Sequence, residues 1–527
     1  MAERERVSTA GVTYTTVDAS YFEKRKLKRS AGVWGIWGLG VAAVISGDFS
    51  GWNLGIPTAG WGGLLIATVF VAVMFFGLFF SIGEMSAAMP HTGGAYSFAR
   101  AAMGPWGGFV TGLAETIEYV MTTAVVVYFS AYYAESAVEY LVGTPGSQIL
   151  PPWLWWVILY AVFIGVNTLG AAIGFRIAII VSVLSIAIIL FFVVVASASG
   201  LVDFGALTQA PAKDAPSGFL PFGVTGILTT LPFAIWFFLG IEELPLAAEE
   251  SHNPTKDIPR GGVWALVTLM VTGAIILFLN SAVLGPQVAG ASGQPLLDAF
   301  TAIFGASDTT NRGVQVVVGI LAIFALIGLL ASLQGIMFAY GRNMYSLSRA
   351  GYYPKFLSLT GKTQTPWVAL IVGGALGFAS LFIVQYSGNT AAGNIVLNIA
   401  VWGAVIAYVL QMTSFVVLRR KFPKANRPYK SPWGYVGAFY AGIIALIAFV
   451  SLLFVPAYQP AIIVIAIVFV VAVILFAVFS RTKLILSPEE EYALSGGLHG
   501  DPQNEDIAAL QHEVVLEAEE AGATSEP

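Results

Sequence analysis

Several acidic residues interrupt the apolar stretches of this 527-residue sequence, and four of them are candidates for a functional site: Asp48, Glu115, Glu118 and Glu242. An ionisable side chain in such a stretch is costly, and it usually faces a partner or a hydrated cavity on a substrate or ion path. These four carboxylates therefore predict a polar site within the apolar part of the protein. Their negative charge suits the binding of a cation.

The segment ISGDFSGWN, residues 45–53, combines Asp48 with glycines and hydroxyl groups. Gly47 and Gly51 permit a helix to unwind, because glycine adopts backbone angles that other residues resist, while Ser46 and Ser50 offer polar partners. Two interpretations of Asp48 stay open. It contacts a substrate ammonium and repels a carboxylate from the positive helix end, or it caps the second half of the helix by accepting backbone amides.

Glu115 and Glu118 are three residues apart and share one helical face. Glu118 lies deeper in its apolar stretch and precedes Tyr119, so we expect it to bind the ammonium together with that tyrosine, and we assign Glu115 to gating or coupling. The alternative for Glu118 is a hydrogen-bonded glutamate that packs the helix into its bundle.

The stretch LPFAIWFFLGIE, residues 231–242, predicts a second interrupted helix. Trp236, Phe237 and Phe238 could line the cavity and contribute a cation–π contact of about 0.5 to 2 kcal/mol, or simply pack against neighbouring helices. Gly240 would supply bare backbone, and Glu242 would act in gating or in stabilising a helix end.

Composition places these segments in a membrane. The chain is 57% hydrophobic and 10% charged, with a mean hydropathy of +0.79, whereas soluble domains carry about 25% charged residues. A helix crosses the hydrocarbon layer in about 20 residues. We predict an all-α membrane protein with twelve transmembrane helices, at 33–57, 62–88, 107–136, 152–171, 176–199, 220–248, 261–285, 313–341, 366–386, 394–418, 434–456 and 459–480.

Positive charge predicts the orientation. Of the 25 lysines and arginines, only Lys213 and Arg312 fall outside the segments that are cytoplasmic if the chain starts inside, as expected from the excess of positive charge in cytoplasmic loops. We expect a multi-pass protein of the cytoplasmic membrane with both termini cytoplasmic. Residues 1–30 form a cytoplasmic segment without a signal peptide, 31–483 the transmembrane permease domain, and 484–527 an acidic, mostly disordered tail.

Other classes of protein fit less well. The sequence has no cysteine, and its four histidines fall in loops or the tail, so we expect no metal site and no cofactor. Twelve helices without a soluble domain indicate a carrier or a channel rather than an enzyme. The basic stretch 419–430 is explained by membrane orientation and contact with lipid headgroups, without nucleic acid. Glu249 and Glu250, with Lys256 and Arg260 nearby, indicate either an inner salt-bridge network or a solvated loop.

Unwound backbone at membrane depth needs protein or a hydrated cavity around it. Interrupted helices in positions one and six fit a carrier of two inverted five-helix repeats, with two extra helices and a substrate site at the midplane. In addition, GEMSAAMPHTGGAYSFAR (83–100), AAEESHNPTKDIPRG (247–261) and YSLSRAGYYPKFLS (345–358) resemble the amino acid-polyamine-organocation permeases. The resemblance implies the same fold and transport by alternating access.

Within this superfamily, VISGDFSGWNLG (44–55), IEYV (117–120) and LPFAIWFFLGIE (231–242) resemble the ethanolamine permeases. The resemblance implies a carrier that imports ethanolamine or a related small primary amine. Three alternatives stay open: a permease for zwitterionic amino acids, a nutrient sensor on a carrier fold, and a channel, which the sparse polar residues disfavour. Coupling to a proton or a sodium ion is also open, and Ser332 offers one hydroxyl to a sodium site.

Overall fold

A computed structural model provides the structure of the chain. It describes residues 6–9, 11–15, 17, 21–22, 24–25, 27–307, 310–387, 392–423, 425–455, 458–487, 490–491 and 493. The predicted disorder of the acidic tail beyond residue 493 lies outside these residues.

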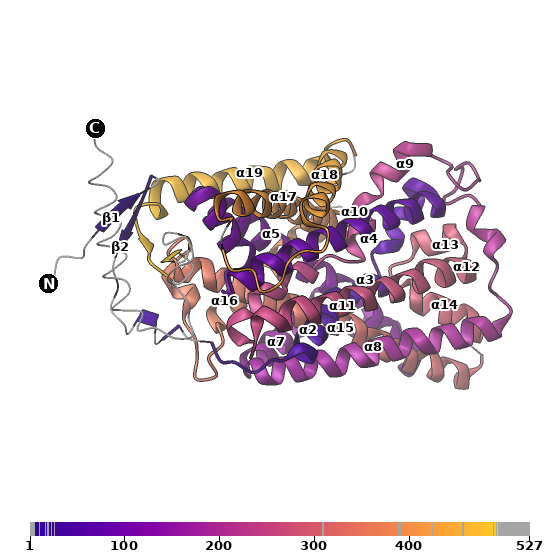
Figure 1. Ribbon diagram of the computed structural model, residues 1–527. Helices are drawn as coiled ribbons and strands as arrows, with labels where there is room; N and C mark the ends of the chain where they lie inside the picture. The colour runs from indigo at the N-terminus through magenta and orange to yellow at the C-terminus, as the bar shows by residue number, and fades with distance from the viewer. Residues whose placement is uncertain are drawn as a thin grey trace.

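The molecule is a bundle of long helices lying roughly along one axis, with α8 on one side and α17 to α19 on the other (Figure 1). The α-helices are α2 Val33–Val44, α3 Ser46–Phe49, α4 Ile56–Ala88, α5 Gly94–Val142, α6 Gly146–Ile149, α7 Pro152–Thr168, α8 Ala171–Ser199, α9 Gly223–Thr229, α10 Leu231–Trp236, α11 Pro254–Ile275, α12 Ser281–Leu284, α13 Pro286–Ala291, α14 Pro295–Phe304, α15 Arg312–Arg349, α16 Trp367–Tyr386, α17 Ala392–Lys421, α18 Gly434–Leu453 and α19 Gln459–Leu475. The short 3-10 helices are η1 Trp52–Gly55, η2 Phe204–Thr208, η3 Ile241–Glu250 and η5 Lys355–Ser358, and the π-helical turns are η4 Ile276–Asn280 and η6 Phe476–Ser480.

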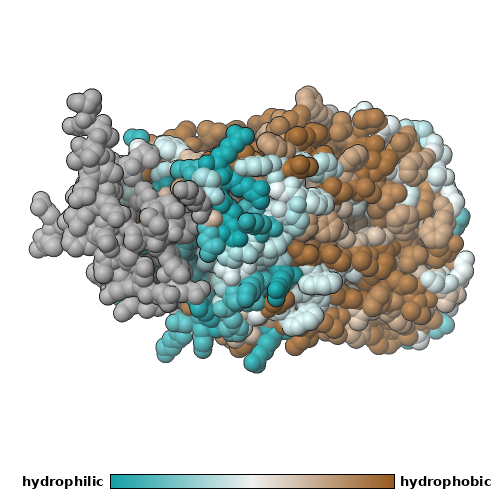
Figure 2. All heavy atoms as spheres, viewed as in Figure 1, coloured by the Kyte–Doolittle hydropathy of each residue, from teal (hydrophilic) through white to brown (hydrophobic). Residues whose placement is uncertain are grey.

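On the face shown in Figure 2, apolar residues cover a wide band of the bundle, and hydrophilic ones gather toward the end that carries β1 (Arg6–Thr9) and β2 (Val12–Thr15) in Figure 1. In the described part of the chain, ten helices are long and apolar enough to cross a membrane. The expected first and fourth spans correspond to the shorter apolar helices Val33–Phe49 and Pro152–Thr168. The structure therefore supports a multi-pass membrane protein, and the count of twelve crossings remains a prediction.

A small sheet departs from the all-helical expectation. Strands β1 (Arg6–Thr9) and β2 (Val12–Thr15) form an antiparallel hairpin, and β3 (Leu484–Ile485) pairs with β2 in parallel. Because β3 follows the last long helix, both ends of the described chain meet at one end of the bundle (Figure 1), as an even number of crossings requires. We call this the sheet end, and the end that carries α9 and α12 to α14 the opposite end.

Helix α5 crosses the centre of the bundle and makes its most extensive contacts with α15 and α17. Its 49 residues would span about 70 Å as a straight helix, far more than the ~30 Å hydrocarbon layer. Gly104, with φ of 79°, divides it just before Pro105, whose ring nitrogen cannot donate a helical hydrogen bond. The longer second part carries Glu115 and Glu118 into the core.

A glycine sets the distance between α5 and α17. A Cβ atom on Gly403 would lie 2.7 Å from the carbonyl oxygen of Ala114 and 2.8 Å from the amide nitrogen of Glu118. Both neighbours are backbone atoms of a packed helix, so they cannot move aside independently. We therefore expect Gly403→Ala to push the two helices apart and to destabilise the protein by about 1–3 kcal/mol, measured as thermal unfolding of the purified protein.

Gly165 in α7 provides the control for this substitution, because a Cβ atom there meets no atom within 4 Å. Gly165→Ala should leave the melting temperature unchanged or raise it, since alanine favours a helix over glycine. Equal melting temperatures for the two variants would contradict the close packing at Gly403.

Candidate functional site

The first helix is interrupted within the expected segment, 45–53, just after Asp48. Helix α2 continues through Ile45 into α3, and the backbone is extended at Ser50 and turns at Gly51, with φ of 97°. Asp48 therefore lies in the last turn before the break. The interpretation of Asp48 as a cap of the second half is wrong, because the Gly51 amide donates to Asn53 Oδ1 at 3.1 Å.

Side chains from three other helices satisfy the backbone around this break. The carbonyl oxygen of Phe49 accepts a hydrogen bond from the Tyr133 hydroxyl at 2.8 Å, and that of Ser50 accepts one from the indole of Trp236 at 2.9 Å. On the helical side, the Ser46 amide donates to Ser332 Oγ at 2.8 Å. The structure thus brings Ser332 to the first break, as a backbone partner.

The opposite end of the molecule covers the break. The Ser50 hydroxyl donates to the Gly293 carbonyl at 2.8 Å, and the Asn53 amide donates to the carbonyls of Ala289 and Ser292, each at 2.7 Å. These three acceptors belong to α13 and the turn before α14. Access to the break from this end therefore requires that segment to move.

The second break lies between α10 and η3. Helix α10 ends at Trp236, and Gly240 has a φ of 112°. Both carboxylate oxygens of Glu242 accept from the Gly240 amide at 3.1 Å, so Glu242 stabilises the start of η3. This contact supports the expected role of Glu242 at a helix end.

The predicted aromatic side chains join the two breaks. Trp52 stacks on Phe237 with ring centroids 5.6 Å apart, and Trp236 packs so closely that a Cβ atom on Gly51 would lie 2.5 Å from its Nε1. A Cβ atom on Gly47 would lie 2.6 Å from the Trp236 carbonyl oxygen. The two breaks therefore touch each other, and the glycines are needed for that approach.

A cluster of carboxylates lies beside the second break. Glu118 is fully buried and accepts from the Tyr408 hydroxyl at 3.3 Å through Oε1, and its carboxyl group also interacts with that of Glu242. Glu115 accepts from the Tyr119 hydroxyl at 3.2 Å and contacts the Asn343 amide at 3.5 Å. We call these three glutamates the glutamate cluster. Tyr408 was missed because a lone tyrosine in an apolar helix carries no local signal.

Asp48 faces a different helix. Its Oδ1 lies 3.3 Å from the position of a Cβ atom on Gly273 of α11, and Thr272 is its polar neighbour there. The Thr272 hydroxyl, however, donates to the Thr268 carbonyl at 3.1 Å, which leaves both Asp48 oxygens without a hydrogen bond among the described residues. No hydrogen bond within that part of the chain joins Asp48 to Glu118, so the structure does not pair the two carboxylates.

The sheet end is closed by ion pairs that the sequence interpretation assigned to other partners. Glu250 pairs with Arg342 at 2.9 Å and Glu249 with Arg349 at 2.6 Å, in place of the expected Lys256 and Arg260. Both arginines lie on α15, which is distant from η3 in the sequence but adjacent to it in the structure. These pairs join the end of η3 to α15.

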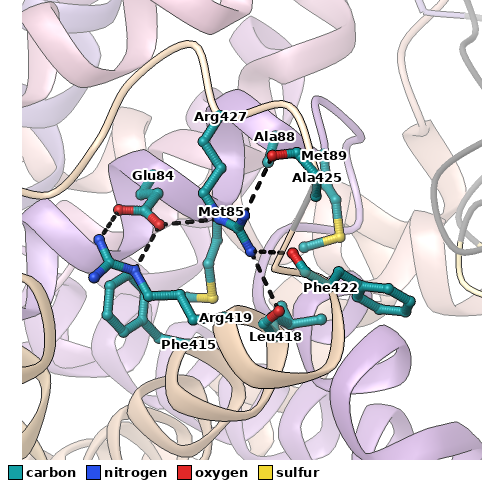
Figure 3. Close-up of a pocket in the computed structure, with 10 residues that line it drawn as sticks. All are labelled: Glu84, Met85, Ala88, Met89, Phe415, Leu418, Arg419, Phe422, Ala425 and Arg427. Atoms are coloured by element: carbon teal, nitrogen blue, oxygen red, sulfur yellow. Dashed lines mark hydrogen bonds and ion pairs between the residues drawn. The ribbon is translucent and has the colours of Figure 1, made fainter.

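The basic stretch 419–430 has an internal partner. Glu84 on α4 binds Arg419 at 2.5 Å and Arg427 at 3.2 Å (Figure 3). The cavity beside these residues measures about 30 Å³, which holds one or two water molecules. This cavity is too small for an organic substrate. A larger cavity, of about 460 Å³, is lined mainly by apolar side chains, so we take the breaks and the glutamate cluster, which carry the buried carboxylates, as the candidate site.

Comparisons with known proteins agree with this architecture. Residues 34–487 match the family model described as amino acid permease. The chain is 26% identical to an uncharacterised transporter of Rhizobium meliloti, over 80% of this chain and 85% of that protein. It is 26% identical to the branched-chain amino acid permease BcaP of Bacillus subtilis (78% and 85% covered) and 24% identical to the methylthioribose transporter of the same organism (78% and 86%).

The chain belongs to the amino acid permease family, because the family model covers most of its length. It is a membrane transporter of a family of permeases rather than of enzymes. The names of the relatives differ in substrate class, so family membership leaves the substrate to be inferred from the site.

The hydrogen bond between Ser46 and Ser332 can be tested directly. Ser332→Ala removes the hydroxyl that accepts from the buried Ser46 amide, and an unsatisfied buried donor costs about 1–3 kcal/mol. We expect a correspondingly lower melting temperature. Ser81 is equally buried, but its hydroxyl donates only to the Gly77 carbonyl within α4, so Ser81→Ala should remain close to the wild type. A Ser332→Ala protein as stable as Ser81→Ala would refute the contact.

Proposed function

We propose that this protein imports ethanolamine or a closely related small primary amine by alternating access. The observation that carries the proposal is the glutamate cluster. Glu115, Glu118 and Glu242 are buried beside a helix break, and within the described chain none of them forms an ion pair with a lysine or arginine. Buried carboxylates need protons or a cationic partner, and a substrate ammonium is such a partner.

The breaks offer little to a substrate carboxylate. In a carrier of zwitterions, free backbone amides at a break would receive that group. Here the Gly51 amide is bound by Asn53, and the Gly240 amide by Glu242. A negative Asp48 beside the first break would repel a carboxylate further. This arrangement favours a cation without a carboxylate.

We place the ammonium against Glu118, whose Oε2 accepts no hydrogen bond among the described residues. Phe237 and Phe238 are buried at the second break and would close the cavity over the ligand. We take the sheet end as cytoplasmic from the distribution of positive charge. A cation is then driven inward by the membrane potential, which contributes about 2.3 kcal/mol per charge per 100 mV, with or without a coupled proton or sodium ion.

The second candidate function is transport of a zwitterionic amino acid, which the name of the related branched-chain amino acid permease favours. The glutamate cluster would then bind the α-ammonium, and Asn53 would have to release the Gly51 amide for the carboxylate. A ligand panel separates the two candidates, since only the amino acid permease binds serine or alanine.

Ligand binding is expected to depend on the charge of Glu118. Ethanolamine at about 100 times its Kd should stabilise the wild-type protein by ~2.7 kcal/mol against unfolding, measured as a rise in melting temperature, while serine, alanine and arginine produce no rise. In Glu118→Gln the rise for ethanolamine should be lost. Flux into proteoliposomes, measured with the same panel, then separates a carrier from a sensor that binds without transport.

Glu139→Gln is the matched control, because Glu139 lies on the same helix near its exposed end. It should retain the full ethanolamine response. An unchanged ethanolamine response in Glu118→Gln would refute the assigned role of Glu118, and a wild-type response to serine or alanine would select the second candidate function.

Asp48 is expected to act by excluding carboxylates. In Asp48→Asn the negative charge disappears while the side chain keeps its size, so serine should begin to stabilise the protein and ethanolamine should still do so. Thermal shifts with paired ligands measure this change. If serine stays without effect in the variant and ethanolamine binding is lost, then Asp48 contacts the ammonium itself.

A further inference from the structure

A glutamate that follows the last membrane helix is buried in the sheet end. Glu490 is 0% exposed and accepts four hydrogen bonds. Its Oε1 accepts from the hydroxyls of Tyr96 and Tyr352, each at 2.8 Å. Its Oε2 accepts from the Tyr14 hydroxyl at 2.6 Å and from Nε of Arg100 at 2.5 Å. The candidate transport site does not involve this carboxylate.

The four donors come from parts of the chain that are distant in sequence. Tyr14 lies on β2, Tyr96 and Arg100 lie in the first turns of α5, and Tyr352 follows the end of α15. We call the described residues between 484 and 493 the terminal strap. Glu490 therefore fastens the strap to the N-terminal hairpin and to two helices at once.

Backbone contacts hold the start of the strap in the same place. The Ile485 amide donates to the Ala350 carbonyl at 2.9 Å, and Leu484 is paired with Tyr14 across the sheet. The Thr13 amide donates to the Arg481 carbonyl at 2.8 Å. The sheet thus holds the start of the strap next to the pocket that the Glu490 carboxylate occupies.

The pocket is built for a charged acceptor. Nη2 of Arg100 donates to the Tyr14 hydroxyl at 2.5 Å, and that hydroxyl in turn donates a hydrogen bond to Glu490. Burial, followed by the charge of Glu490, raises the pKa of Tyr14 well above its usual value, which keeps this group a donor. Every group that faces the carboxylate donates, and an amide in its place would set its NH₂ against donors.

Residues next to the strap's partners take part in closing the sheet end. The Tyr21 hydroxyl donates to the Arg349 carbonyl at 3.0 Å, and Arg349 pairs with Glu249 of η3. Glu249 also accepts from the amide of Thr92, two residues before α5 begins. The segments that Glu490 joins are therefore the same ones that close the sheet end around η3.

We propose that the terminal strap is a latch, in which Glu490 holds the sheet end closed and must leave its pocket before the carrier opens to that side. Alternating access requires each end to open in turn. Separation of α5, α15 and the N-terminal hairpin would break hydrogen bonds to a buried charge, which are among the stronger ones in proteins. The latch would act whichever substrate the carrier transports, so this proposal does not depend on the assignment of an amine substrate.

The absence of cysteine in the chain allows a direct test. Ala248 in η3 is buried within the sheet end, and Ala248→Cys gives a single thiol there. In membranes that expose the sheet end, the rate of labelling by a membrane-impermeant maleimide reports opening. Glu490→Gln should raise this rate at least about tenfold, as expected for the loss of a hydrogen bond to a charged group.

Two controls separate a latch from general damage. Ala289→Cys places the thiol in a buried position at the opposite end, and its labelling, measured in membranes of the reverse orientation, should not rise with Glu490→Gln. Tyr352→Phe removes one donor to Glu490 and should raise labelling of Ala248→Cys. Tyr353→Phe should not, because the Tyr353 hydroxyl contacts Thr116 at 2.8 Å instead.

Unchanged labelling of the Ala248→Cys thiol in both Glu490→Gln and Tyr352→Phe would overturn the proposal. An equal rise at both thiol positions would also overturn it, because the strap would then stabilise the whole protein. If Glu490→Gln does not reach the membrane, the comparison of Tyr352→Phe with Tyr353→Phe decides. Labelling of the Ala248→Cys thiol should rise in Tyr352→Phe alone, and an unchanged rate in Tyr352→Phe would overturn the proposal. Ethanolamine binding plays no part in this readout, so the latch and the proposed substrate can fail separately.

Discussion

The structure depends on the need to satisfy unwound backbone at membrane depth. Hydrocarbon offers no hydrogen bonds, so a broken helix is stable only where the protein supplies them. At the first break these partners are Tyr133, Trp236, Ser332 and Asn53, from four different parts of the chain. The requirement explains why the two breaks touch, and why a glycine is needed at 47 and at 51, where larger side chains would separate them.

Satisfying the backbone internally changes what the site can bind. The break amides at Gly51 and Gly240 are bound by this chain's own side chains, whereas Asp48 and one oxygen of Glu118 lack hydrogen-bond donors among the described residues. The unsatisfied capacity of the site is therefore negative. The proposal of a cationic substrate rests on this contrast rather than on the names of the relatives.

Local signals in the sequence predicted the interrupted helices, but they did not place side chains across helices. The glycines around Asp48 indicated a break correctly, yet Asn53 caps it and Asp48 precedes it. Helical periodicity places Glu118 on a face without saying which helix covers that face, so Tyr408 could not be found. For the same reason Glu249 and Glu250 were assigned to nearby Lys256 and Arg260, while their partners lie about a hundred residues away on α15. The acidic composition after residue 483 predicted disorder, and composition cannot reveal that Glu490 has a pocket.

The two ends of the molecule are closed by different chemistry. At the opposite end, Ser50 and Asn53 donate to backbone carbonyls, and all these groups are neutral. At the sheet end, the contacts are a buried ion pair, Arg342–Glu250, a partly buried one, Arg349–Glu249, and the carboxylate of Glu490. Opening hydrates the released charges, so these pairs contribute less net stability than their short distances suggest. The ion pairs do, however, fix the register between η3 and α15, because each arginine binds one particular carboxylate.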